Sequence, residues 1–315
     1  MTDLAASPAR RVPLGLAIGA AGAVIGLLPG VIGGGRLPAQ NLWATQTLPE
    51  DMPFALLPIS QYTVGTVLCL FVVGGVAAGL GIRALRRRNG IPAWSAAVGL
   101  AAVHLIAIVQ TFAVLAVGLG ISSGDRRVLL YFGGMLGGAV VVALLAQLGF
   151  WLTSQRSAGP VALGVALAAV PATMWLASGL FAFTGPVVQP LFVSQLVQWL
   201  PVIIVGFALA WCGVRPLRRL GVWAAALLAL WVTPALFTAV SYGLGMRVLK
   251  DDLPQMAAAS IQLFPVVLVE TNAWLPVVIA AGGGALGALV WSRIDAVRDD
   301  ASHTDAMPGA PVRQP

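Results

Sequence analysis

Eight long apolar stretches constrain this chain more than any other feature, because they carry no charged side chain except Arg293 at the end of the last one. A helix needs about 20 mostly apolar residues to cross a bilayer, and lipid leaves every backbone polar group to be satisfied internally. The stretches are continuous rather than alternating, which excludes a barrel of transmembrane strands. The sequence therefore predicts an all-α, polytopic membrane helix bundle with about eight transmembrane helices, at residues 13–35, 62–82, 93–120, 128–152, 161–183, 191–212, 221–245 and 273–294.

The composition supports the same class. The chain is 59% hydrophobic and 9% charged, with a mean hydropathy of +0.92. Soluble domains carry about 25% charged residues, so the expected partner of this surface is the lipid bilayer. The net charge of +7 comes from arginines clustered at the ends of apolar stretches. No basic stripe interleaved with aromatic residues occurs, and we expect no nucleic-acid partner.

The arginines also predict an orientation. With the N-terminus inside, thirteen of the 18 Lys and Arg residues lie on the cytoplasmic side, as the positive-inside rule requires. We expect a multi-pass protein of the cell membrane with both termini cytoplasmic. Arg10 and Arg11 resemble the start of a signal peptide, but the apolar stretch that follows is long enough to span, which favours a retained helix over a cleaved one. The polar residues 295–315 are predicted to form a disordered cytoplasmic tail.

Two outer segments are longer than a turn. Residues 36–61 join the first two predicted helices, and residues 246–272 join the last two. Within the second segment, residues 253–269 are apolar and contain Pro254 and Pro265. This stretch has three interpretations: an interfacial helix, a re-entrant segment or a ninth span. The first two are favoured, because the polar residues Ser292 and Arg293 end the last apolar run on the cytoplasmic side.

An internal similarity suggests duplication. The run Gly81-Ile82-Arg83-Ala84-Leu85-Arg86-Arg87 resembles Gly213-Val214-Arg215-Pro216-Leu217-Arg218-Arg219, and matching Ser-Gln, Trp, Phe and Gly-Leu-Gly elements follow the same order. We predict a 4+4 parallel tandem repeat, with residues 1–152 as the first four-helix membrane repeat and 153–294 as the second. The alternative is that orientation pressure produced the two arginine clusters independently.

Glycines mark the expected helix contacts. Without a hydrophobic drive between helices in lipid, small residues that allow close backbone approach dominate packing. The first span has the longest glycine face, at Gly15, Gly19, Gly22, Gly26 and Gly30. The fourth span has two overlapping pairs, Gly133 with Gly137 and Gly134 with Gly138. The second half has four prolines predicted inside spans, and transporters often place sites at such bent helices; they are Pro171, Pro201, Pro234 and Pro276.

His104 is the one ionisable side chain near the middle of a predicted span. A buried ionisable group costs several kcal/mol unless it is paired, which makes it a candidate for function. Thr111 lies on the same helix face and Gln110 flanks it, so the three are candidates for a substrate path or proton relay. The alternative, a neutral histidine hydrogen-bonded to a neighbouring helix, is favoured because no intramembrane carboxylate accompanies it.

A second polar group lies at the outer ends of the second and sixth spans. Gln61, Gln195 and Gln198, with Trp199, are candidates to rim an outward-facing cavity between the halves. The simpler interpretation is that these side chains meet headgroups and water, as tryptophan and polar residues do at membrane interfaces.

No catalytic set is evident. The spans lack the nucleophile, base and metal-ligand combinations that membrane enzymes need, and we predict no enzyme, no metal site and no cofactor. Two isolated cysteines, Cys69 and Cys212, form neither a disulfide framework nor a metal motif. The favoured function is a transporter or permease for an uncharged or apolar substrate. The alternative is a non-catalytic assembly, regulatory or immunity component that contacts a membrane partner, or a second copy of itself, through its helices.

Overall fold

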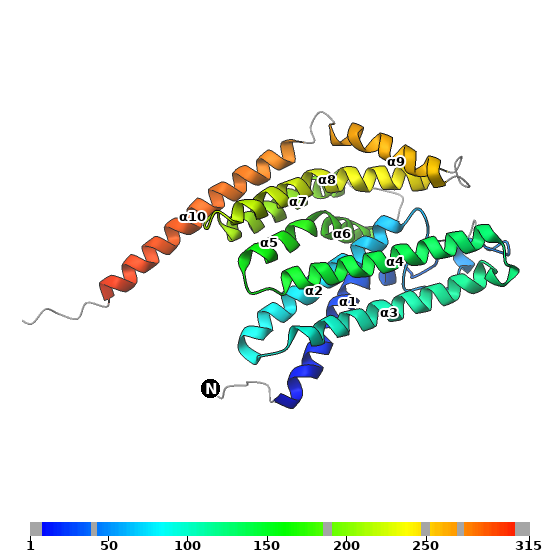
Figure 1. The fold of residues 1–315 in the computed structure, drawn as a ribbon, viewed down its shortest axis with the longest axis horizontal. Coiled ribbons are helices and arrows are strands. Elements are labelled where there is room, and N and C mark those ends of the chain that lie inside the picture. The colour runs from blue at the N-terminus through cyan, green and yellow to red at the C-terminus, as the bar shows by residue number, and fades with distance from the viewer. Residues whose placement is uncertain (1–7, 39–42, 185–190, 247–252, 270–273, 306–315) are drawn as a thin grey trace, which may run out of the picture.

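The computed structural model describes residues 8–38, 43–184, 191–246, 253–269 and 274–305. Within these ranges the chain is helical, with no strand beyond a single bridge between Arg36 and Phe54. The long helices lie side by side in one bundle (Figure 1). They are α1 (Pro8–Ile32), α2 (Val64–Asn89), α3 (Ala93–Gly118), α4 (Arg126–Thr153), α5 (Ala158–Leu167), α6 (Ala169–Thr184), α7 (Leu191–Cys212), α8 (Arg219–Gly245), α9 (Leu253–Leu268) and α10 (Leu275–Asp305).

The prediction of a polytopic membrane bundle is confirmed. Seven of the described helices are long and apolar enough to cross a bilayer, and the number becomes eight if α5 and α6, which meet at a bend of 46°, are one span. Large apolar side chains face outward along the helices, among them Leu105 at 61% exposure and Ile203 at 65%. In water such a surface would be unstable, so these helices belong in lipid. The chain is a multi-pass membrane protein.

The glycine face of α1 forms the closest helix contacts, as the sequence predicts. A Cβ at Gly19 would overlap the carbonyl oxygen of Ala96 in α3, and one at Gly26 would overlap the carbonyl oxygen of Leu70 in α2. Helices α2 and α3 therefore approach the α1 backbone so closely that only glycine fits. Four of the five glycines of α4 differ, because Gly133, Gly134, Gly137 and Gly138 have no described neighbour within 4 Å of a built Cβ.

The two halves pair their helices in the same way. In the first half α1 packs on α2 and α3, and α2 packs on α4; in the second, α5 and α6 pack on α7 and α8, and α7 packs on α10. In the first half Gly75 of α2 lies against Ala146 of α4, and in the second Gly206 of α7 lies 3.8 Å, measured from a built Cβ, from the Cα of Ala280 in α10. This shared pairing is what a tandem repeat would produce. The duplication into residues 1–152 and 153–294 itself stays a prediction.

The first outer segment packs into the bundle rather than lying above it. Five of its apolar side chains are at most 3% exposed: Leu37, Met52, Ala55, Leu57 and Ile59. The beginning and the later part of this segment are hydrogen-bonded to each other. The Leu37 N–H donates to the Pro53 carbonyl at 3.1 Å, and the Ala55 N–H donates to the Gly35 carbonyl at 2.6 Å. This segment therefore covers the ends of the helices of the first half that it connects.

Helix α9 enters the bundle only halfway. It runs back along α8, with Gly243 against Ser260, and the Trp231 indole N–H donates to the Leu268 carbonyl at 3.0 Å. Trp231 is in the middle of α8, about 18 Å from its first residue at 1.5 Å per residue. The last turn of α9 therefore lies at the middle of the α8 length.

Helix α10 begins at a similar depth and continues in the same direction. Ala280 lies beside Gly206 and Gly284 lies beside Leu209, so α10 runs parallel to α7. Along the helix axis, α10 begins at Leu275, about 7 Å before Ala280, whereas α7 begins about 22 Å before Gly206. Because Ala280 and Gly206 lie side by side, α10 begins deeper in the bundle than α7 does. Measured along the neighbouring helices α8 and α7, α9 ends and α10 begins near the middle of the bundle. The three interpretations of residues 253–269, as an interfacial helix, a re-entrant segment or a ninth span, stay predictions.

The proline positions explain two of these helix starts. Pro254 and Pro276 are the second residues of α9 and α10, where the missing N–H has no intrahelical partner to lose. Pro276 therefore starts a helix instead of bending one, unlike Pro201 and Pro234, which are inside α7 and α8. Pro171 follows directly on the 46° bend between α5 and α6.

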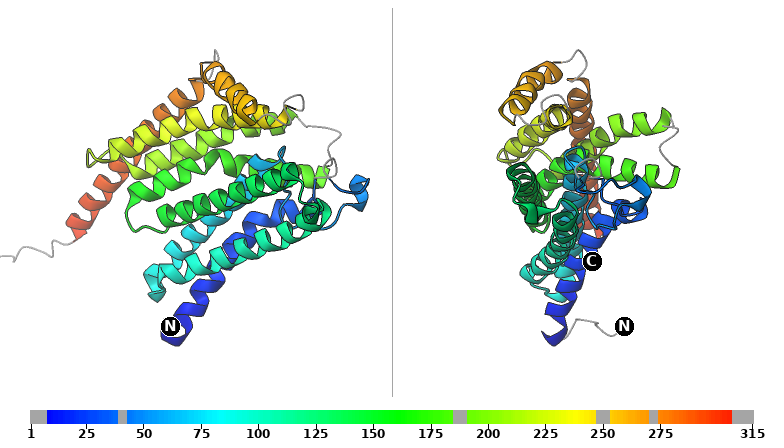
Figure 2. Two further views of the ribbon diagram at one scale, coloured as in Figure 1. Left: turned by 45° about the vertical axis from the view of Figure 1, so that its right-hand side comes forward. Right: turned by 90° about the vertical axis from the view of Figure 1, so that its right-hand side faces the viewer.

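The start of α1 and the end of α10 lie toward the same end of the bundle (Figure 2). Helix α10 continues to Asp305, so residues 295–305, predicted as part of a disordered tail, are helical. Their sequence explains the difference, because no glycine or proline interrupts it before Pro308. Residues 306–315 are outside the described part of the chain.

Candidate ligand cavity

A cavity of about 380 Å³ opens at the end of the bundle where α4 begins, which is the predicted outer end, and it lies between residues of the two halves. Its walls come from the end of the outer segment and from α2, α4, α8 and α9. Binding sites for small molecules typically occupy about 300–1,000 Å³, so this volume is large enough for a slender ligand. The lining residues are Ile59, Gln61, Val64, Val67, Arg127, Leu130, Tyr131, Gly134, Met135, Gly138, Ala139, Val142, Leu244 and Met256.

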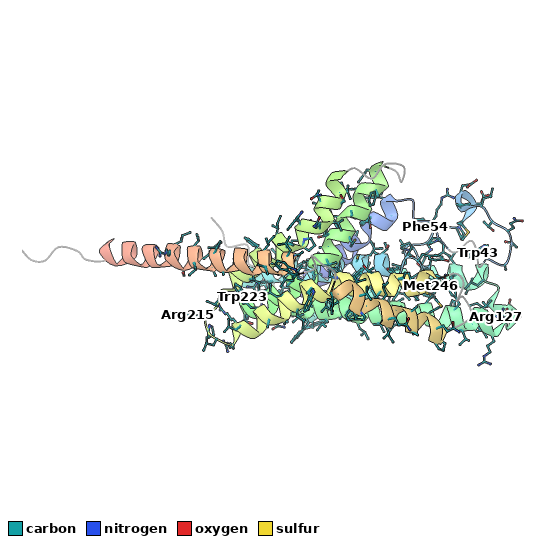
Figure 3. All side chains as sticks on the ribbon, turned by 90° about the horizontal axis from the view of Figure 1, so that it is seen from above. Trp43, Phe54, Arg127, Arg215, Trp223 and Met246 are labelled. Atoms are coloured by element: carbon teal, nitrogen blue, oxygen red, sulfur yellow. The ribbon has the colours of Figure 1, made fainter. Side chains whose placement is uncertain are left out.

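Helix α4 supplies most of this wall, from Arg127 near its first turn to Val142 near its middle. The side chain of Asp125 caps the helix by accepting from the Arg127 N–H at 2.9 Å. Figure 3 shows Arg127 at one end of the molecule and Arg215 toward the other. Arg127 and the positive end of the α4 dipole therefore lie at the same end of the cavity.

The polarity of the cavity is graded along α4. At the outer end Arg127, Gln61 and Tyr131 provide polar groups. Deeper in, the lining is made of glycine, alanine, methionine and valine. Such a site matches a molecule with one polar end and an apolar body.

Two glycines give the cavity its width. Gly134 and Gly138 line it, and a Cβ at either position would meet no described atom within 4 Å. The glycines beside them, Gly133 and Gly137, are equally open but do not line the cavity. The α4 glycines thus leave room for a ligand on one face and for lipid or another helix on the next.

Gln61 is the one predicted rim residue that lines this cavity. It also lines a smaller cavity of about 100 Å³ between α2 and α8, which shares Val64 and Leu244 with the first. Gln195 and Gln198 are exposed on α7 and line neither cavity. The predicted rim of three glutamines is therefore not assembled in this structure.

His104 lies elsewhere, where α1, α2 and α3 meet. It is 2% exposed, and its ring stacks on Phe71 with centroids 4.0 Å apart and planes 5° from parallel. Neither ring nitrogen has a hydrogen-bond partner among the described residues. The hydrogen bond to a neighbouring helix that the alternative interpretation expected is absent there, and the observed contact is aromatic packing. A role in a substrate path stays untested.

Gln110 and Thr111 hold the first outer segment. The Gln110 amide accepts from the Leu56 N–H at 2.9 Å and donates to the Phe54 carbonyl at 3.1 Å. The Thr111 hydroxyl accepts from the Leu57 N–H at 3.1 Å. The structure brings these two predicted residues together as a clamp on the chain itself, and neither lines the cavity.

Thr111→Val is expected to lower the free energy of unfolding by about 1–3 kcal/mol, because it leaves the buried Leu57 N–H without an acceptor. Denaturant titration in detergent micelles measures this loss. Thr45→Val is the control, since Thr45 is exposed and its hydroxyl bonds only locally, to Thr47. Equal stability of the two variants would show that the clamp contributes nothing.

The pattern that could have revealed the cavity is a stripe along α4. Arg127, Tyr131, Gly134 and Gly138 recur at three- and four-residue spacing and so share one helix face. A basic residue and a tyrosine followed by two glycines on that face indicate a graded groove. Within the described residues, no group of three or more histidine, cysteine or acidic side chains is placed to hold a metal ion.

Comparisons of this chain with protein families, with curated proteins and with solved structures give no match.

Proposed function

We propose that this protein is a permease-like protein of the cell membrane that takes a slender apolar or amphipathic molecule into the cavity between its halves. The observation that carries the proposal is the 380 Å³ cavity itself, with its polar outer end and apolar body. No acid–base pair or nucleophile and base line it, so we propose a non-enzymatic role. We place both termini and the arginine-rich helix ends in the cytoplasm.

The broken helices support transport over simple binding. Met256 of the half-length helix α9 forms part of the cavity wall, and α9 ends beside the middle of α8. Discontinuous helices near the middle of the bundle are where many transporters place their sites, often at the interface of internal repeats. The predicted 4+4 repeat would put the cavity at such an interface.

Gly138→Leu is expected to fill the cavity and weaken ligand binding at least about tenfold, since a branched side chain would occupy space that the ligand needs. A dansyl-labelled lysophospholipid is a suitable probe, because its single acyl chain and compact headgroup match the graded lining. Binding is read from the rise in dansyl fluorescence in detergent. Transport is measured in proteoliposomes as the fraction of the probe that albumin, added outside the vesicles, can no longer extract.

Gly137→Leu is the matched control, because Gly137 is open but does not line the cavity. We expect it to bind and translocate the probe as the unmodified protein does. Saturable binding with unchanged affinity in Gly138→Leu would refute the cavity as the site.

The second candidate function, a helix-contacting membrane component, rests on the face of α4 that carries Gly133 and Gly137. Both glycines open on the surface of the described structure, and a GxxxG pair of this kind lets two helices approach closely. If this candidate is correct, Gly137→Leu rather than Gly138→Leu abolishes the protein's association with a second copy or a membrane partner. Cross-linking in native membranes distinguishes the two outcomes.

A further inference from the structure

A second cavity, of about 340 Å³, lies at the opposite, arginine-rich end of the bundle. It is lined by Arg83 and Arg86 from the end of α2 and by Ser154, Gln155 and Arg156 just after α4. Three of these five residues are arginines and none is acidic. This cavity is separate from the outer one, because the two lie at opposite ends of α4.

The polar wall of this cavity is held in place by hydrogen bonds. Arg83 donates to the Gln155 carbonyl, and its guanidinium lies 5.4 Å from the centre of the Trp211 ring of α7. The Ser154 hydroxyl and the Gln155 amide both donate to the Trp151 carbonyl, at 3.0 and 3.1 Å. Arg83 thus joins α2, α4 and α7, and it positions the cavity wall.

Arg86 and Arg156 have a different role. Arg86 is half-buried and Arg156 is exposed, and they face the cavity from two different helix ends. Helix α5 begins two residues after Arg156, at Ala158, so the positive end of its dipole adds to the same region. Orientation pressure explains why arginines gather at this end of the bundle. It does not explain why three of them surround one cavity that contains no acidic group.

We propose that this cavity binds a phosphoryl group, carried either by a lipid headgroup or by a soluble phosphate compound. The planar fork of a guanidinium matches the oxygens of a phosphate, and free phosphate or a phosphate monoester carries enough negative charge to balance more than one arginine, whereas a lipid phosphodiester balances one. Basic pockets between membrane helices at the cytoplasmic side bind phosphate headgroups in this way. The inference does not depend on the proposed function of the outer cavity.

The test uses the full chain and two variants of equal charge. Arg86→Gln with Arg156→Gln removes two of the three positive charges at the cavity and leaves Arg83, which holds the helices, in place. Arg218→Gln with Arg293→Gln removes two exposed arginines elsewhere, one before α8 and one in the inner part of α10. Thermal unfolding is followed with inorganic phosphate in dodecyl maltoside at constant ionic strength. It is repeated without phosphate in nanodiscs of phosphatidylglycerol and of phosphatidylcholine.

A ligand that binds the folded state raises the unfolding temperature, and the rise grows with the ratio of the ligand concentration to its Kd. We expect the cavity variant to need at least about tenfold more phosphate for the same rise, or to lose the stabilisation by phosphatidylglycerol, while the Arg218 and Arg293 variant keeps it. Stabilisation by inorganic phosphate in micelles indicates a soluble phosphate compound, and stabilisation by phosphatidylglycerol alone indicates a headgroup. Equal losses in both variants, or no stabilisation by either probe, would overturn the proposal.

Discussion

Gly19→Leu is expected to prevent the protein from accumulating in its folded form. A side chain at this position would overlap the carbonyl oxygen of Ala96, and its Cβ would come within 2.7 Å of the Leu100 backbone nitrogen. Both atoms belong to the α3 backbone, so no side-chain rotation can relieve the overlap. Overpacking commonly costs about 1–3 kcal/mol, and separating two helix backbones should cost at least the upper value. Size-exclusion chromatography of detergent extracts measures the folded fraction.

Gly133→Leu makes the same chemical change where a built Cβ meets no described atom within 4 Å. We expect this variant to accumulate at the level of the unmodified protein, because leucine also forms helix better than glycine does. If Gly19→Leu accumulated as well as Gly133→Leu, the close approach of α1 and α3 would be wrong.

Gly243→Leu is expected to displace α9 from α8 while leaving the rest of the bundle folded. A Cβ at Gly243 would overlap the Ser260 hydroxyl and lie 2.7 Å from the Met256 carbonyl oxygen. Helix α9 packs on α8 and lies at the edge of the bundle (Figure 1), so it can move away without separating the other helices. The displacement removes one wall of the outer cavity, because Met256 lines it. Binding of the dansyl-labelled lysophospholipid should weaken at least about tenfold as this wall is lost.

A single cysteine reports the movement directly. Met256 is 6% exposed, so Met256→Cys should react slowly with a thiol reagent and much faster when Gly243→Leu is also present. Gly245→Leu, two residues further along, is the control, since a Cβ there meets no described atom within 4 Å. Equal reaction rates in the two leucine variants would contradict the packing of α9 along α8.

The spans and the tightest helix contacts could be predicted from the sequence alone. Apolar length decides where a helix can cross lipid, and the predicted 93–120 and 191–212 correspond to α3 and α7 within two residues. The glycine face of α1 was also predictable, because its spacing persists over the whole helix. The α4 glycines show the limit of that reasoning, since the same spacing there faces open space. Spacing identifies a small face but not the surface it meets.

The candidate site was harder to predict, because tertiary contacts decide it. Gln110 and Thr111 look like polar residues of a substrate path, yet they form hydrogen bonds to the first outer segment. No local sequence pattern predicts that this segment is buried. Gln61 and Gln195 occupy similar positions in the two halves, but only Gln61 lines a cavity. The depth at which α9 ends depends on its contact with Trp231, which is 37 residues away in the chain. Each of these features depends on how the helices pack against one another, and the lengths of the apolar stretches do not predict that packing.

The central claim is that the apolar helices cross a bilayer with the arginine-rich ends on the cytoplasmic side. It is tested most directly by labelling single cysteines at Ser122 and Leu217, which are both exposed and lie beyond the ends of α3 and α7. The buried Cys69 and Cys212 are first replaced by alanine. A membrane-impermeant maleimide should label Ser122→Cys in intact cells and Leu217→Cys only after permeabilisation. Labelling of both positions in intact cells, or the reverse order, would contradict the account.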